Sequence, residues 1–213
     1  LDLIRLREVF AQLVDGLHAL HRANKVHRDI KPENVQITTE GRVVILDFGL
    51  VCEVLQLESA IVGTIAYMAP EQAAGRPVGA AADWYSVGVL LYESLTNRLP
   101  FEGAGLSVLA DKQHGIPASP RSLCASTPTD LDTLCTALLK ADPHERPKYA
   151  DIIEVLRPAG GQSRAKDKDQ PPRDAEVSGV TFVGRSHETS ALMQVFADTR
   201  KGPLDRVGWL GRE

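Results

Sequence analysis

The stretch VHRDIKPENV, residues 26–35, places six polar side chains between apolar positions. Polar groups that leave water without a partner cost free energy, so a fold keeps such a cluster near its interior only where the groups bind one another or a ligand. The stretch therefore predicts a functional loop in a region that its apolar residues would otherwise assign to a strand or a buried segment.

A long helix is predicted before this loop, over residues 3–23. Its apolar side chains recur at alternating steps of four and three, which gathers them on one face of a helix. They are Leu6, Phe10, Leu13, Leu17 and Leu20. The charged residues between them, Arg5, Arg7, Glu8 and Asp15, are expected on the solvent side. Asn24 is expected to end the helix in a left-handed conformation.

Short β-branched runs follow the loop, VQIT and VVILDF, with TEGR between them. They predict a small hairpin that turns at Gly41. Residues 49–80 show little periodicity and are expected to form a long ordered loop. Further helices are predicted over 83–96, where most faces are apolar, over 127–140, and over 148–156.

The bulk composition excludes several function classes. With 43% hydrophobic residues, 24% charged residues and a net charge of −4, the chain has the composition of an ordinary soluble globular protein. Neither nucleic acid nor a membrane surface is an expected partner. No apolar run approaches the roughly 18 residues of a membrane-spanning helix. The three cysteines form no metal-binding pattern, so a reducing cytoplasm is the expected location.

The sequence DFG at residues 47–49 supplies the second half of a possible phosphate-transfer site. Magnesium takes oxygen ligands and draws only one or two of them from protein side chains when it also holds phosphates. Asn34 and Asp47, at the mouth of the predicted hairpin, can provide that share. Asp29 lies near enough to accept a proton from an attacking hydroxyl, and Lys31 can contact phosphate oxygens.

The motifs HRDIKPEN, DFG and APE, the last at residues 69–71, occur here in an order and spacing that closely resemble the catalytic lobe of eukaryotic-like protein kinases of the bacterial type. The resemblance covers residues 1–157. It implies that Asp29 is the catalytic base, that Lys31 contacts phosphate, and that Asn34 and Asp47 hold Mg²⁺, with Mn²⁺ as an alternative ion.

The same resemblance implies a specificity for serine and threonine, because Lys31 and the Gly63-Thr64 pair match that class of kinase. Thr64 would bridge Asp29 and Lys31 and help to position the substrate hydroxyl. Residues 50–68 would be the activation loop. Ser59 is the expected regulatory phosphorylation site, and Arg28 would bind a phosphate on that loop.

Other matched positions imply structural roles. Glu71 and Arg146 resemble the buried ion pair of the family, and Asp83 resembles the aspartate that holds the backbone of the catalytic loop. His27 and Phe48 resemble members of the hydrophobic spine. Gln36 stands beneath the expected adenine ring of ATP, where the family usually has leucine.

The expected architecture is mainly α: a helical C-terminal kinase lobe with a small β-hairpin at residues 1–157, then a flexible linker at 158–180. Residues 181–213, which carry FVGR at positions 182–185, resemble the start of an α/β P-loop ATPase of the AAA/STAND type. The glycine-rich loop and phosphate-orienting lysine of the N-terminal lobe would precede Leu1. The chain is therefore expected to be a fragment with negligible catalysis by itself.

Three functions fit these observations to different degrees. The favoured one is an ATP-dependent serine/threonine kinase that acts on proteins. A regulatory pseudokinase that controls the attached ATPase is the alternative from another class. A small-molecule phosphotransferase of the related fold ranks last, because such enzymes lack the GT and YMAPE motifs found here.

Overall fold

The computed structural model describes residues 1–46, 65–103 and 106–157. These residues form a mainly helical unit with one two-stranded antiparallel sheet. The longer helices are α1 (Leu3–Arg22), α4 (Ala80–Thr96), α5 (Leu106–His114), α7 (Thr129–Leu138) and α8 (Tyr149–Leu156). The shorter ones are η1 (Pro32–Asn34), α3 (Pro70–Ala73), α6 (Pro120–Leu123) and η2 (Pro143–Glu145), and the strands are β1 (Val35–Ile37) and β2 (Val43–Ile45). Within these ranges, no helix has the length and apolar character needed to cross a bilayer.

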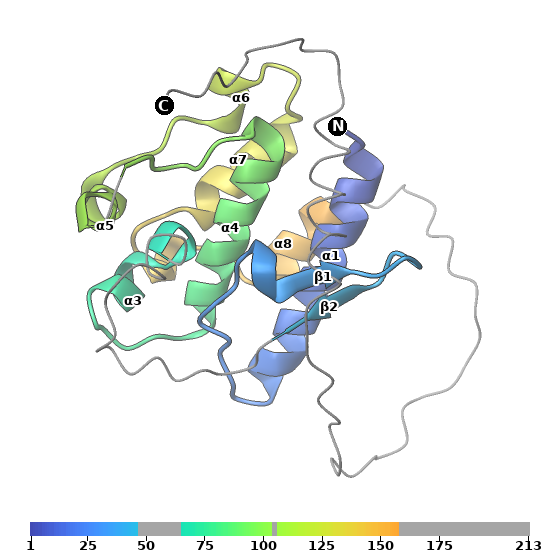
Figure 1. Cartoon of the computed structure of the whole chain (residues 1–213), viewed down its shortest axis with the longest axis horizontal. Coiled ribbons are helices and arrows are strands. Elements are labelled where there is room, and N and C mark those ends of the chain that lie inside the picture. The colour runs from blue at the N-terminus through green and yellow to red at the C-terminus, as the bar shows by residue number, and fades with distance from the viewer. Residues whose placement is uncertain (47–64, 104–105, 158–213) are drawn as a thin grey trace, which may run out of the picture.

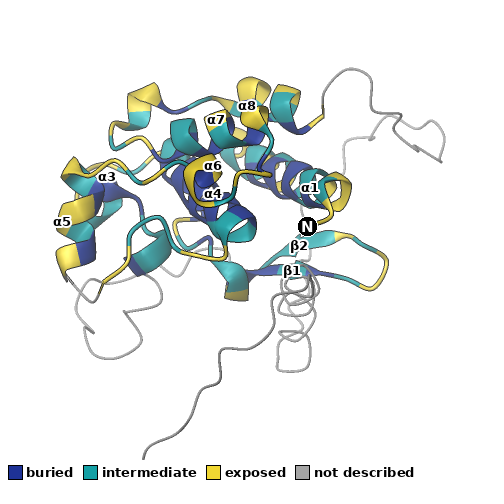
Figure 2. Cartoon of the chain, turned by 90° about the horizontal axis from the view of Figure 1, so that it is seen from above, coloured by how far each residue is buried: buried dark blue, intermediate teal, exposed yellow. Residues whose placement is uncertain are grey.

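Helix α4 forms the centre of the structure. Every residue from Ala82 to Tyr92 is buried, as expected for a helix that is enclosed on all sides. Helix α7 packs along it, and α1 and α8 pack against each other beside it (Figure 1). Viewed from above, the dark blue of α4 is surrounded by helices whose outer faces are exposed (Figure 2).

Helix α1 follows the predicted stripe with small differences. Leu6, Phe10, Leu13 and Leu17 are buried, whereas Leu20 is half-buried. The helix begins at an Asp2 N-cap, and Asn24 adopts the left-handed conformation that was predicted, with φ 56°.

Two of the charged residues expected on the solvent side of α1 are instead half-buried. Arg7 donates to the carbonyl of Val155 (2.6 Å) and to Asp130, and Asp15 accepts from Tyr149 (3.0 Å). The prediction was wrong for these two residues because α8 packs on that side of α1.

The hairpin forms where the sequence predicted it, with Val35 opposite Ile45 and Ile37 opposite Val43. Gly41 turns the chain at φ 82°, a conformation that favours glycine. Gln12 of α1 holds the hairpin from one side: its amide donates to the Gly41 carbonyl and accepts from the Val43 N–H, both at 3.1 Å. The sheet is therefore fixed to α1 at the turn end of the hairpin.

The prediction of one long loop over residues 49–80 was wrong at its C-terminal end. Helix α3 lies within that range, and α4 begins at Ala80, three residues before the predicted start. Helices α5 and α6 were not predicted, because they are short or weakly patterned; they lie between the predicted helices.

Candidate active site

The catalytic loop, residues 26–34, runs from the end of α1 into the hairpin. Arg28 has φ 68°, a left-handed conformation that costs a non-glycine residue about 1–2 kcal/mol. Asp83, near the start of α4, holds this conformation. Its carboxylate accepts from the backbone N–H of His27 (2.9 Å) and of Arg28 (2.8 Å). The carboxylate is fully buried, so these contacts are shielded from water.

Three predicted site residues meet within this loop. The ammonium of Lys31 lies 2.8 Å from Oδ2 of Asp29, and the amide of Asn34 donates to the same oxygen at 2.9 Å. Asn34 also donates to the Asp29 carbonyl at 2.7 Å. Both side-chain contacts fall on Oδ2, which leaves Oδ1 of Asp29 without a hydrogen bond to the described residues. The arrangement orients one carboxylate oxygen, and no residue within the described ranges donates to the other.

The orientation of Asn34 suits a metal ligand. Because its amide nitrogen is turned toward two oxygens of Asp29, its Oδ1 atom keeps its lone pairs and accepts no hydrogen bond from the part of the chain that the structure describes. An amide oxygen of this kind is a ligand that magnesium accepts. Asp47, the second expected ligand, lies outside the described residues. Elsewhere in those residues, no cluster of three or more His, Cys, Asp or Glu side chains is placed to bind a metal.

His27 is buried, with 1% of its surface exposed. Its Nε2 lies 2.8 Å from the carbonyl of Leu46, the last described residue before the predicted DFG motif. His27 therefore joins the catalytic loop to the chain that leads toward Asp47. Phe48, its expected partner in the hydrophobic spine, lies outside the described residues.

Glu71 and Arg146 form the predicted buried ion pair. Two guanidinium nitrogens of Arg146 contact the two oxygens of Glu71 at 2.7 and 2.8 Å. The remaining donors reach the backbone carbonyls of Ala81, Lys140 and Ala141. One arginine thus joins α3, the start of α4 and the turn before η2, which is the geometry that a planar guanidinium favours.

The other expected residues divide into two groups. Arg28 has an exposed side chain, so its guanidinium is accessible to an anion, and Gln36 is half-buried on β1. Ser59 and Thr64 lie outside the described residues. The roles proposed for these four residues remain predictions.

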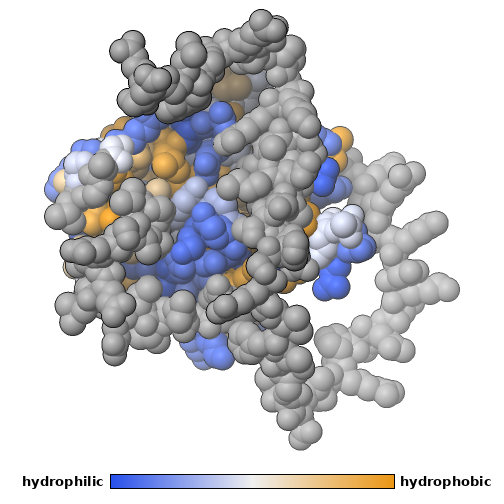
Figure 3. All heavy atoms as spheres, in the orientation of Figure 1, coloured by the Kyte–Doolittle hydropathy of each residue, from blue (hydrophilic) through white to orange (hydrophobic). Residues whose placement is uncertain are grey.

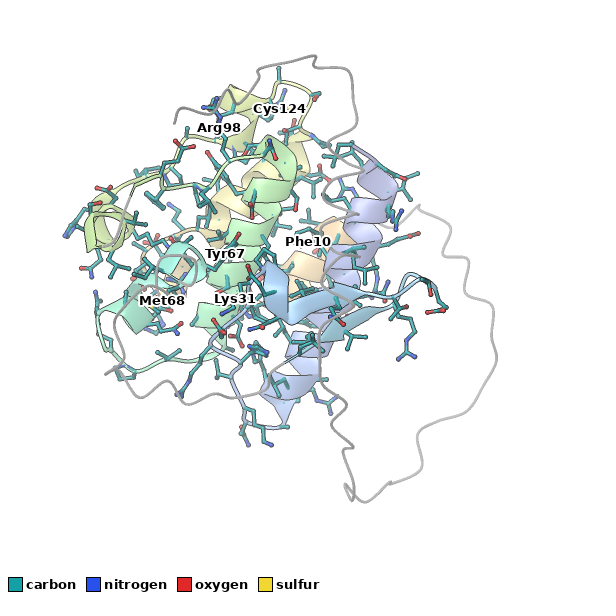
Figure 4. All side chains as sticks on the ribbon, viewed as in Figure 1. Phe10, Lys31, Tyr67, Met68, Arg98 and Cys124 are labelled. Atoms are coloured by element: carbon teal, nitrogen blue, oxygen red, sulfur yellow. The ribbon has the colours of Figure 1, made fainter. Side chains whose placement is uncertain are left out.

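Several residues with no predicted role also contact the site or the segment beside it. His21 lies 2.7 Å from Asp83, Gln72 donates to the Arg28 carbonyl (2.8 Å), and Tyr67 donates to Glu93 (2.7 Å). Figure 4 shows Lys31 and Tyr67 on the face where the catalytic loop meets the segment before α3. Hydrophilic residues (blue) gather in the same part of the surface in Figure 3.

Burial raises the pKa of the Tyr67 phenol well above its usual value, and the hydrogen bond to Glu93 adds to the shift. Tyr67 therefore stays neutral and acts as a hydrogen-bond donor. A tyrosine that follows a loop carries no sequence pattern that would have predicted this role.

In this site Lys31 and Asn34 hold the Asp29 carboxylate, and Asp83 of α4 fixes the loop that carries them. The sequence that builds the site also matches a known family. Residues 2–155 match the protein kinase domain family. The chain belongs to this family. The predicted resemblance to bacterial-type serine/threonine kinases is therefore confirmed at the level of the kinase domain.

Curated relatives give the same assignment. The chain is 36% identical over 194 residues to the serine/threonine-protein kinase PknA of Corynebacterium glutamicum, covering 88% of this chain and 40% of that protein. It is 38% identical over 152 residues to PknL of Mycobacterium tuberculosis, covering 69% and 38%. The probable serine/threonine-protein kinase PkwA of Thermomonospora curvata is 37% identical over 178 residues, covering 82% and 23%. The chain thus spans well under half of the length of these relatives.

Proposed function

We propose that the full-length protein carrying this chain is a serine/threonine kinase, which transfers the γ-phosphate of ATP to serine or threonine hydroxyls of protein substrates. The observation that carries the proposal is the state of the Asp29 carboxylate. Oδ2 is held by Lys31 and Asn34, while Oδ1 accepts no hydrogen bond from the described residues. The kinase-domain match of this chain and the names of its relatives support the same activity.

In the proposed reaction, Oδ1 of Asp29 accepts the proton of the substrate hydroxyl. The hydroxyl oxygen forms a bond to the γ-phosphorus while the bond from that phosphorus to the bridging oxygen of ADP breaks. Lys31 contacts the transferring phosphoryl group and keeps the carboxylate in place. Thr64 is proposed to position the hydroxyl and Ser59 to be a site of regulatory phosphorylation, with Arg28 as its anion contact.

We propose Mg²⁺ as the divalent ion, bound by Oδ1 of Asn34 together with Asp47. The open amide oxygen of Asn34 supports this assignment. The ion balances the charge of the ATP phosphates when it is bound. Gln36 on β1 is proposed to lie under the adenine ring.

The domain boundaries are part of the proposal. Residues 1–157 would be the C-terminal lobe of the kinase, residues 158–180 a linker and residues 181–213 the start of an AAA/STAND-type ATPase. The mainly helical architecture with a single hairpin supports the first assignment. The FVGR motif and its amphipathic continuation support the last.

Transfer of radiolabelled phosphate from ATP to a generic protein acceptor tests the activity in the full-length protein. We expect Asp29→Asn to lower the rate by about 10²–10⁴-fold, the usual contribution of a general base. Asp111→Asn is the matched control, because Asp111 is an exposed carboxylate on α5 away from the catalytic loop. Phosphoamino-acid analysis should find serine or threonine. Absence of transfer by the wild type would contradict the proposal and favour a regulatory pseudokinase.

A further inference from the structure

Lys112 on α5 is a buried lysine whose ammonium is surrounded by backbone oxygens. Only 1% of the residue is exposed. Its Nζ donates to the carbonyls of Ile65 (2.7 Å), Ala66 (2.6 Å) and Met68 (2.8 Å). An ammonium has three N–H donors, so the three carbonyls satisfy it completely.

No carboxylate pairs with this ammonium among the residues that the structure describes. The ring of Tyr85 lies beneath it, 5.3 Å from Nζ to the centroid, and the Arg146 guanidinium lies 5.0 Å from the same centroid. Burial of a charge is costly unless hydrogen bonds replace its hydration. The three hydrogen bonds of the Lys112 ammonium therefore all go to the backbone of residues 65–68.

Side-chain donors reach the backbone carbonyls of that segment, and the Ile65 carbonyl also accepts from the Met68 N–H at 3.3 Å. The carbonyl of Tyr67, the one that Lys112 does not reach, accepts from the hydroxyl of Ser86 on α4 at 2.8 Å. All four carbonyls of residues 65–68 thus accept a side-chain donor, three of them from a single residue. Because an unpaired buried carbonyl destabilises a fold, the position of the segment is tied to these two side chains.

The segment also leads directly to the active site. Residues 65–68 continue into α3, where Gln72 donates to the carbonyl of Arg28 in the catalytic loop at 2.8 Å. In the other direction along the chain the segment begins at the residue after Thr64. A displacement of residues 65–68 would therefore move the backbone that follows Thr64, the residue proposed to position the substrate hydroxyl.

We propose that Lys112 is a positioning residue of the kinase, which fixes residues 65–68 through their carbonyls and thereby sets the binding of the protein substrate without affecting the binding of ATP. The inference rests on the proposed kinase function. Lys112 touches neither Asp29 nor Lys31 in the structure, so its effect on catalysis passes through the backbone that it holds.

Lys112→Met tests this role in the full-length protein, since methionine has a similar length and no donor. We expect the KM for the protein substrate to rise about tenfold, the effect of losing roughly one net hydrogen bond of positioning energy, with the KM for ATP unchanged. Lys112→Arg keeps the charge and N–H donors, so its KM for the protein substrate should lie between those of the wild type and Lys112→Met. Lys140→Met is the matched control, because the Lys140 side chain is 52% exposed.

Hydrogen exchange separates this inference from the proposed function. Lys112→Met should speed amide exchange in residues 65–73 and leave α1 and α7 at wild-type rates, whether or not the protein transfers phosphate. If Lys112→Met does not fold, Lys112→Arg and Ser86→Ala carry the test. Wild-type substrate KM and wild-type exchange in the folded variants would overturn the inference. If the wild type transfers no phosphate but Lys112→Met still speeds exchange in residues 65–73, only the proposed kinase activity would be overturned.

Discussion

Asp83 and His21 are joined by a 2.7 Å contact between the carboxylate Oδ2 and the imidazole Nε2, although they lie 62 residues apart. The same carboxylate holds the N–H groups of His27 and Arg28. Three donors from α1 and the catalytic loop thus converge on one buried residue at the start of α4. The left-handed conformation of Arg28 depends on this convergence, which connects the central helix to the catalytic loop.

Asp83→Asn should destabilise the protein strongly. The amide keeps one acceptor, but its NH₂ group faces donors that the carboxylate satisfied, and charge-assisted hydrogen bonds are the stronger kind. We expect the free energy of unfolding to fall by roughly 3 kcal/mol, as measured by urea denaturation. His21→Gln, which changes only one of the three donors, should cost about 1 kcal/mol. An equal loss in both variants would contradict the central role of Asp83.

The Glu71–Arg146 pair should show strong coupling in a double-mutant cycle. Glu71→Gln leaves a buried guanidinium without its counter-charge, which is expected to cost about 3–5 kcal/mol. Arg146→Met removes the guanidinium donors to Glu71 and to three backbone carbonyls and should cost as much. We expect the double variant to lose less than the sum of the single losses by at least about 1 kcal/mol. Additive losses would mean that the two residues act independently.

An exposed pair provides the comparison for this cycle. Lys140 and Glu145 lie 3.8 Å apart, with side chains 52% and 61% exposed. Ion pairs of this kind contribute less than about 1 kcal/mol, and much of that is screened by salt. The coupling of the buried pair should therefore persist in high salt, whereas that of Lys140 and Glu145 should vanish.

Gly88 lies on the face of α4 that packs against α7. A Cβ atom added there would lie 2.7 Å from Leu138 Cβ and 3.3 Å from its backbone carbon. Gly88→Ala should therefore lower the free energy of unfolding by about 1–3 kcal/mol, although alanine is the better helix former. Thermal or urea unfolding measures the loss.

Gly16→Ala is the matched control for this packing argument. Gly16 is also helical, but the atom that its Cβ would meet at 2.9 Å is Cδ1 of Ile45, the far end of a flexible side chain. The side chain can move aside, so the gain in helix propensity of up to about 1 kcal/mol should offset the contact. Similar destabilisation by both substitutions would contradict the close packing of α4 on α7.

Local patterns were sufficient to predict the elements that carry the site. The apolar stripe of α1, the enclosed helix α4 and the left-handed residue at Asn24 each follow from short-range chemistry of the chain. The meeting of Asp29, Lys31 and Asn34 was also predictable, since these residues lie within six positions of one another and their spacing matches a known motif.

Features that depend on distant parts of the chain were not predictable in this way. Lys112 stands in the sequence DKQH, which has the composition of an exposed helix, and it is buried only because residues 65–68 pack over it. The half-burial of Arg7 and Asp15 likewise depends on α8, more than 100 residues further along. Periodicity describes which face of a helix is apolar, and it does not describe which partner covers a charged residue.

The ionisation of Lys112 should make stability and substrate binding respond to pH in opposite directions. Burial lowers the pKa of its ammonium from 10.5 to about 7, because it removes hydration from the charged form. The groups that face it from other elements are the Tyr85 ring on α4 and, across that ring, Arg146 paired with Glu71.

Between pH 7 and 10.5 the unfolded chain binds a proton at Lys112 that the folded chain lacks, so the free energy of unfolding should rise with pH in this window. We expect the free energy of unfolding of the wild type, minus that of Lys112→Met, to increase by roughly 2 kcal/mol from about pH 7 to about pH 9. Urea denaturation of both proteins measures it. Subtracting the variant removes the contributions of all other titrating groups.

Over the same pH range the neutral amine of Lys112 retains only two donors for three carbonyls, so the substrate KM of the wild type should rise. The substrate KM of Lys112→Arg should stay level, because arginine remains charged. A pH-independent stability difference would mean that Lys112 keeps its proton throughout, and the carbonyl contacts would then outweigh the loss of hydration.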